Sequence, residues 1–249
     1  MKRFSMVLLV LAAKNVPYLK KSIIRSIVIL AVALLAQQVT RAQGTITYLS
    51  NLGLPSAGSE MVASDSWQAT LFVTGNNAGG YLVDSVQLAM ANATGTPSGF
   101  EATICVVNPN DPAGAEPGNS LGAFNGSLNP STAGDYTYTP VSDVTLSPDT
   151  DYFIVLTAGT GLVTGAYEWS QTGTYSYNPT GGWESVGNIV SSGNGSSWTP
   201  VPDTDAQFAI SATAIPEPSL CSLLLLGGGL IIYVRKQKRH WNLCEIKRH

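Results

Sequence analysis

From residue 45 to residue 212 the sequence consists of short segments in which apolar and polar residues alternate, separated by clusters of Gly, Pro, Asn, Asp and Ser. A period of two residues is typical of a β-strand with one buried face. No stretch with the 3.6-residue period of a helix exceeds two turns between Gln43 and Ala214. Eight strands are therefore predicted: Thr45–Leu49, Trp67–Val73, Leu82–Ala89, Glu101–Val107, Tyr136–Val141, Tyr152–Thr157, Ala166–Ser170 and Ala206–Ala212. The fold class expected is all-β, an antiparallel β-sandwich of the jelly-roll-like type, although the alternation does not distinguish a sandwich from a barrel.

The charges are segregated along the chain. All 13 Lys and Arg residues lie outside residues 42–234, whereas 14 Asp and Glu residues lie between Ala42 and Ala214. Such an acidic region repels phosphate backbones, so no nucleic-acid partner is expected. It contains no His, Lys or Arg, which excludes Ser-His-Asp and Cys-His sites, His-ligated zinc and an arginine clamp within it.

The N-terminal residues 1–42 have the pattern of a secretory signal with a long basic region. An apolar run over Ile23–Ala36 follows Lys20 and Lys21, and small residues follow it. This order of basic, apolar and small residues is typical of a signal peptide. We expect cleavage after Ala42, with Ala36 as a second candidate and an uncleaved signal anchor as the alternative.

The C-terminal region predicts one transmembrane helix. The apolar run Leu220–Val234 spans 15 residues, or ~23 Å as a helix, which is short for a hydrocarbon core of ~30 Å. A basic cluster follows at Arg235, Lys236, Lys238 and Arg239. Basic residues that flank a span remain on the cytoplasmic side, which places residues 43–215 on the far side of the membrane.

Residues 214–240 resemble a known sorting signal. Pro216, Glu217 and Pro218 precede the Leu- and Gly-rich run and the basic cluster, as in the PEP-CTERM signal of Gram-negative, biofilm-forming bacteria. The resemblance implies recognition by an exosortase, a membrane cysteine protease, and delivery to the cell surface. The tail 241–249 extends beyond the usual length of this signal.

Residues 45–213 resemble the choice-of-anchor ectodomains that are attached to such signals. The resemblance rests on residues 68–74 and 81–88, on Leu146–Leu156 and on the closing Phe208-Ala209-Ile210. It implies an ectodomain over residues 43–213 and a location at the surface, and it carries over no catalytic residues. No enzymatic activity is expected. A carboxylate-only glycoside hydrolase remains an alternative, with candidates Asp84, Glu101, Glu168 and Glu184.

Two ligand classes are considered for the loops. Asp149 with Asp151 and Asp203 with Asp205 place oxygen donors two residues apart on loops, and Ca²⁺ binds about 6–8 such oxygens. The alternative is that these Asp residues form turns without any metal. The aromatic residues Trp169, Trp183 and Trp198 lie in a stretch rich in Gly, Ser and Asn. Their ring faces could bind sugars. The alternative is that Trp169 belongs to the core and that Trp183 and Trp198 close long loops. Calcium is thus a weak expectation, and no other cofactor is expected.

Together these features predict an exported bacterial cell-surface or extracellular-matrix protein with a structural or adhesive role. The partners expected are the exosortase-type protease, the membrane and an exopolysaccharide. The alternatives are a carbohydrate-binding module of the exopolysaccharide layer and the carboxylate-only hydrolase.

Overall fold

A computed structural model describes residues 44–113, 116–173, 177–201 and 205–217, all within one compact unit, Gln43–Glu217. The predicted signal peptide with Ala42, the apolar run Leu220–Val234, the basic cluster and the tail lie outside the described residues, as does Pro218. Within the described ranges, no helix has the length and apolarity needed to cross a membrane.

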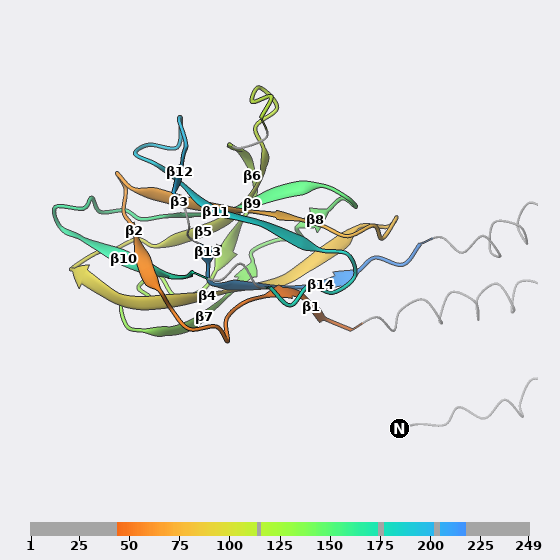
Figure 1. Cartoon of the computed structure of the whole chain (residues 1–249), viewed down its shortest axis with the longest axis horizontal. Helices are drawn as coiled ribbons and strands as arrows, with labels where there is room; N and C mark the ends of the chain where they lie inside the picture. The colour runs from red at the N-terminus through yellow and green to blue at the C-terminus, as the bar shows by residue number, and fades with distance from the viewer. Residues whose placement is uncertain (1–43, 114–115, 174–176, 202–204, 218–249) are drawn as a thin grey trace, which may run out of the picture. The chain divides into compact units, whose positions relative to one another are not determined.

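The described part of the unit contains fourteen strands and no helix (Figure 1). Each of the eight predicted segments overlaps an observed strand, whereas the alternation did not reveal β2, β6, β8, β11 or β12. The strands are β1 (Ile46–Ser50), β2 (Gly58–Val62), β3 (Trp67–Val73), β4 (Tyr81–Gly95), β5 (Glu101–Val107), β6 (Pro117–Asn125), β7 (Gly134–Pro140), β8 (Thr145–Leu146), β9 (Asp151–Thr157), β10 (Gly165–Thr172), β11 (Glu184–Ser192), β12 (Thr199–Val201), β13 (Asp205–Ala206) and β14 (Phe208–Ala214).

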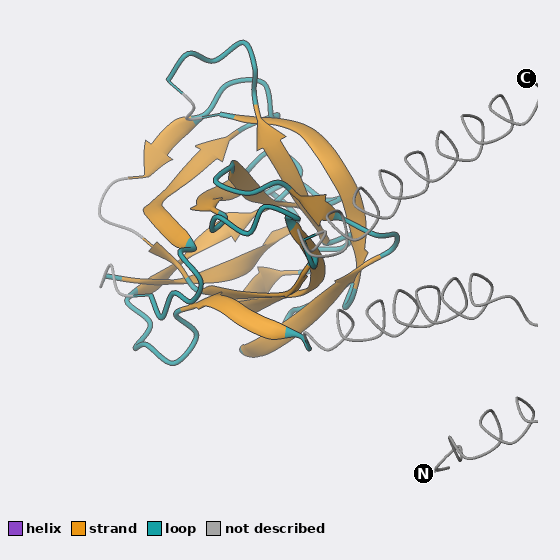
Figure 2. Ribbon diagram, turned by 90° about the vertical axis from the view of Figure 1, so that its right-hand side faces the viewer, coloured by secondary structure: helices purple, strands orange, loops and turns teal. Residues whose placement is uncertain are grey.

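The strands pair in the order β1-β14-β4-β7-β6-β5-β9-β3-β11-β12, and every pair is antiparallel. The sheet turns over between β7 and β6, where only Phe124 with Pro140 and Asn125 with Thr139 are paired. We call β1-β14-β4-β7 the first layer and β6-β5-β9-β3-β11-β12 the second layer. Figure 2 shows the two layers. The first layer also contains β10, which pairs with the far half of β4 and carries β2 and β13. This arrangement is all-β and antiparallel, and it is consistent with a β-sandwich.

The core lies between the two layers. Alternate residues of β4 and β14, including Leu88 and Ile210, pack with Phe72, Ile104 and Ile154 of the second layer in one buried cluster. Burying each such side chain contributes about 1.5–3 kcal/mol. Since residues 43–217 contain no Lys, Arg or His, the stability of this unit rests on such burial and on backbone hydrogen bonds.

The outer face of the second layer carries a smaller apolar cluster. Cys105, Phe153 and Val190 are buried there, and Trp67 and Trp198 pack against them. Cys105 is buried, and burial raises the pKa of its thiol. Trp198, in the loop between β11 and β12, therefore packs on the outer face of the second layer.

The first and last strands of the unit are neighbours. In the β1–β14 pair, Ile46 lies opposite Ala212 and Ser50 lies opposite Ala209. Because the two strands are antiparallel, the chain enters β1 at the same end of the sheet where it leaves β14, as Figure 1 shows. The start of β1 and the end of β14 thus lie at the same edge of the unit.

Candidate functional site

Glu217, the charged residue of the predicted sorting motif, lies against the loop that joins β3 to β4. The Ile215 amide donates to the Gly80 carbonyl at 2.9 Å, and the Asn77 side-chain amide donates to the Ile215 carbonyl at 2.9 Å. The Ala78 amide donates to Glu217 Oε1 at 3.2 Å. Both backbone groups of Ile215 and one carboxylate oxygen of Glu217 are thus engaged by the same loop. We call residues 215–217 the exit segment.

The loop residues Asn77–Gly80 form a tight turn that suits this contact. The Gly80 amide donates to the Asn77 carbonyl at 2.8 Å, and the Asn77 side chain also donates to the Gly80 carbonyl at 2.6 Å. Gly80 has φ +76°, a conformation that glycine adopts without strain. A Cβ on Gly79 would collide with the Ile215 carbonyl oxygen, so glycine at this position allows the two backbones to approach.

Trp183 lies in an aromatic cluster of the core. Its ring stacks on Tyr48 at 4.9 Å between centroids and on Phe72 at 5.7 Å, with Tyr81 edge-on at 5.0 Å. The side chain is 0% exposed. Its ring faces are occupied by other rings, which corrects the expectation that Trp183 presents a face to a sugar. The Tyr81 hydroxyl accepts from the Asn77 amide at 3.2 Å, which connects this cluster to the turn.

Trp169 is also a core residue. It lies on β10, is 0% exposed, and donates from Nε1 to the Gln207 carbonyl at 3.1 Å. Trp169 therefore belongs to the core, which was the alternative to glycan binding, and its ring faces the interior at the junction of β10, β13 and β14. Trp198 is partly buried against the small outer cluster. Of the three candidates it alone is not fully buried, and its glycan binding stays a prediction.

The loop of Asp149 and Asp151 is held by hydrogen bonds within the chain. The Asp149 amide donates to the Gly75 carbonyl at 3.0 Å, and the Thr150 amide donates to Thr74 Oγ1 at 3.0 Å. Both carboxylates are exposed and border a hollow of about 370 Å³. In the described ranges no three His, Cys, Asp or Glu side chains are grouped as a metal site would require. A calcium site here stays a prediction.

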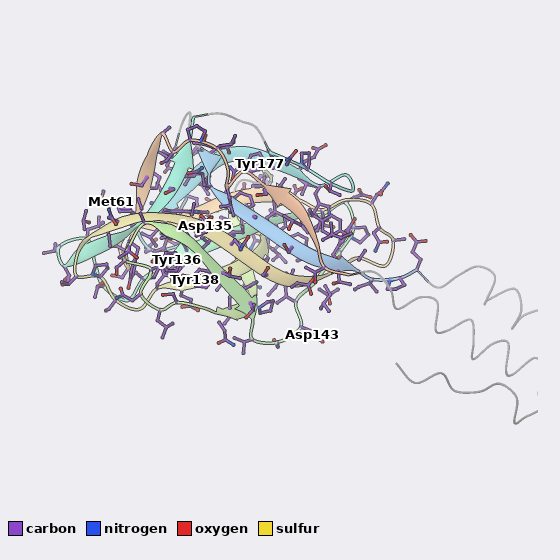
Figure 3. The ribbon with its side chains drawn as sticks, turned by 90° about the horizontal axis from the view of Figure 1, so that it is seen from below. Met61, Asp135, Tyr136, Tyr138, Asp143 and Tyr177 are labelled. Atoms are coloured by element: carbon purple, nitrogen blue, oxygen red, sulfur yellow. The ribbon has the colours of Figure 1, made fainter. Side chains whose placement is uncertain are left out.

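Asp205 differs from the other candidates because it is buried, with 1% of its surface exposed. Neither carboxylate oxygen makes a hydrogen bond of normal geometry to the described residues. Burial raises the pKa of Asp205, and the neighbouring Tyr177 hydroxyl opposes that shift. Burial likewise raises the pKa of Tyr177. Figure 3 shows Tyr177 on the β1 side of the first layer. Asp203, the other member of this predicted pair, lies outside the described residues.

Two of the four candidate hydrolase carboxylates, Glu101 and Glu184, lie far apart in the second layer. Glu101 lies opposite Thr157 and Glu184 lies opposite Val73, which is paired with Asp151. Thr157 and Asp151, which mark these two positions on β9, are six residues apart, or ~20 Å. This separation exceeds the ~5–9.5 Å between carboxylates that a glycosidase requires.

The other two candidates lie in the first layer, on β4 and β10. Asp84 accepts from Thr213 Oγ1 at 2.8 Å, and Glu168 accepts from Ser59 Oγ at 2.8 Å. Burial and the charge of Glu168 raise the pKa of Glu60. Glu168 is paired with Met61, so the side chain of Glu60, one residue away, points to the opposite face of the sheet.

Sequence reasoning did not identify Asn77, Ala78 and Gly79 as partners of the exit segment. Residues 75–80 read as a cluster of small and turn-forming residues, which predicts a loop but not what the loop contacts. The available signal was the pair of adjacent glycines, Gly79 and Gly80, close after Asn77, a pattern that indicates a tight approach of the backbone.

The sequence matches no protein-family model and no curated protein. Among solved structures, the cysteine protease and lectin-like domains of Cwp84, a surface layer associated protein of Clostridium difficile, align with 68% of this chain at 12% identity and a TM-score of 0.43. Clostridial cysteine protease Cwp84 after propeptide cleavage aligns with 68% at 13% identity and a TM-score of 0.42. The chain covers 36% and 40% of those proteins. At these values the likeness carries no inference about activity, ligand or location.

Proposed function

We propose that this chain is an exported bacterial cell-surface or matrix protein with a structural or adhesive role, sorted through its PEP-CTERM-like signal. The observation that carries the proposal is the order of segments in the sequence. A secretory signal precedes an acidic β-domain, and a Pro-Glu-Pro motif, an apolar run and a basic cluster follow it. In this proposal the β-domain is a jelly-roll-like sandwich, and the exosortase-type protease and an exopolysaccharide are its partners.

Two structural features support this proposal. The compact unit ends at Glu217, so the motif begins where the folded domain ends. The unit also has no side-chain cations to pair with its carboxylates, and a surface of one charge sign keeps proteins soluble and apart. That property suits a domain that must remain folded at high local density outside the cell.

The proposal is tested by intact mass measurement and terminal sequencing of the protein recovered from its native cells. We expect a mature species that begins near Gln43 and ends near Pro216. A species that retains Leu220–His249 would instead identify a permanently anchored membrane protein and would rule out exosortase processing.

A further inference from the structure

From the contacts of the exit segment we infer that the Asn77–Gly80 turn is an intramolecular clamp that restrains access of the processing enzyme to the Pro-Glu-Pro motif. This inference rests on the proposed function, because it assumes that an enzyme reads the motif. The clamp itself is defined by contacts that do not depend on that assumption.

The clamp engages the groups that an enzyme would need. A protease commonly binds its substrate as an extended strand, through the backbone amides and carbonyls of that substrate. The Ile215 amide and carbonyl already bond to Gly80 and Asn77. Glu217 supplies the charge of the motif, and one of its carboxylate oxygens accepts from the Ala78 amide at 3.2 Å. At Ile215 and Glu217 the clamped state and the enzyme-bound state therefore exclude one another.

The clamp is weak enough to open. Glu217 and Pro216 are exposed, and a hydrogen bond exchanged with water contributes little net stability. When only a fraction of the molecules is competent to bind, the apparent affinity falls in proportion to that fraction. A few such bonds reduce the competent fraction by about tenfold, so the turn slows processing without preventing it.

Two substitutions open the clamp and leave the motif unchanged. Asn77→Ala removes the side-chain bonds to the Gly80 and Ile215 carbonyls, and Gly79→Ala places a Cβ against the Ile215 carbonyl oxygen. Asn110→Ala, in the β5–β6 loop, and Gly53→Ala, where a Cβ meets nothing within 4 Å, are the matched controls.

The test uses the full chain in the cells that produce it and has two measurements. Hydrogen exchange reports protection of the Ile215 and Ala78 amides, with β9 as the reference for folding. Pulse-chase followed by intact mass reports the rate of tail removal. In Asn77→Ala and Gly79→Ala we expect amide protection to fall about tenfold and tail removal to accelerate by up to about tenfold, with no change in the controls.

The outcomes separate the clamp from the proposed function. Unchanged protection of Ile215 and Ala78 in both variants, with β9 intact, would show that there is no clamp. Reduced protection with an unchanged or slower rate of tail removal would show that the turn does not restrain the enzyme. If the tail is not removed in any variant, including the natural sequence, the proposed function and the inferred restraint both fail. Hydrogen exchange would still show whether the clamp exists.

Discussion

Trp169 and Trp183 are both fully buried, but their indole N–H groups differ, and replacing each by Phe isolates that difference. Trp169 Nε1 donates to the Gln207 carbonyl at 3.1 Å, whereas Trp183 Nε1 has no hydrogen-bond partner among the described residues. Trp→Phe removes the same apolar atoms at both positions, so that contribution largely cancels in the comparison.

The difference in free energy of unfolding follows from the N–H groups. Trp169→Phe loses a hydrogen bond worth about 1 kcal/mol, and Trp183→Phe removes an unpaired buried donor whose desolvation costs about 1–3 kcal/mol. The Gln207 carbonyl also accepts a hydrogen bond from the Ala89 amide at 3.1 Å. Trp169→Phe therefore leaves no buried acceptor without a partner. We expect Trp183→Phe to be more stable than Trp169→Phe by about 2–4 kcal/mol.

Urea unfolding of the compact unit Gln43–Glu217, followed by circular dichroism, measures this difference. With a slope of about 2 kcal/mol per M, the two midpoints should differ by about 1–2 M. Trp198→Phe is the control, since its Nε1 also lacks a partner in the described part of the chain. Should Trp183→Phe prove as unstable as Trp169→Phe, the indole N–H groups do not control stability, and the reasoning is refuted.

Three further predictions concern charge and backbone. Because burial raises the folded-state pKa of Asp205, stability should fall as pH rises from the ordinary Asp pKa of about 4 through that raised value. Asp205→Asn should therefore stabilise the unit by ~1–3 kcal/mol at neutral pH. Equal unfolding midpoints at pH 4 and pH 7 for the natural sequence would contradict this. Gly195→Ala should destabilise the unit by ~1–3 kcal/mol in thermal unfolding, since Gly195 has φ +74° and a Cβ would contact the Trp67 ring. A Gly195→Ala variant with an unchanged melting temperature would refute that. Sodium chloride should raise the melting temperature by screening the uncompensated carboxylates, and a much larger rise with calcium at equal ionic strength would instead support the calcium alternative.

Many strand positions could be predicted because the alternation of apolar and polar residues is a local property of the sequence. The alternation in Trp67–Val73 and Glu101–Val107 matches β3 and β5 residue for residue. Strands such as β6 (Pro117–Asn125) were missed, since this segment contains Pro, Gly, Asn and Ser and pairs through irregular registers on β5. Its strand conformation depends on its neighbours and not on its own residues.

The candidate sites were less predictable because they depend on contacts between distant residues. The same composition around Trp169 and Trp183 fits an exposed loop or a buried strand, and only the packing of Tyr48 and Phe72 distinguishes the two at Trp183. The contact of Ala78 with Glu217 joins residues separated by 139 positions. No local pattern encodes such a contact.

The position of β14 determines how the unit would respond to mechanical load. β14 lies between β1 and β4 and is paired with both along most of its length. Its hydrogen bonds run perpendicular to the strand, so a pull on Glu217 along β14 would shear both ladders at once. Many bonds would have to break together, whereas a peeling load would break them one at a time. A tether at this end would therefore load the unit in its resistant direction.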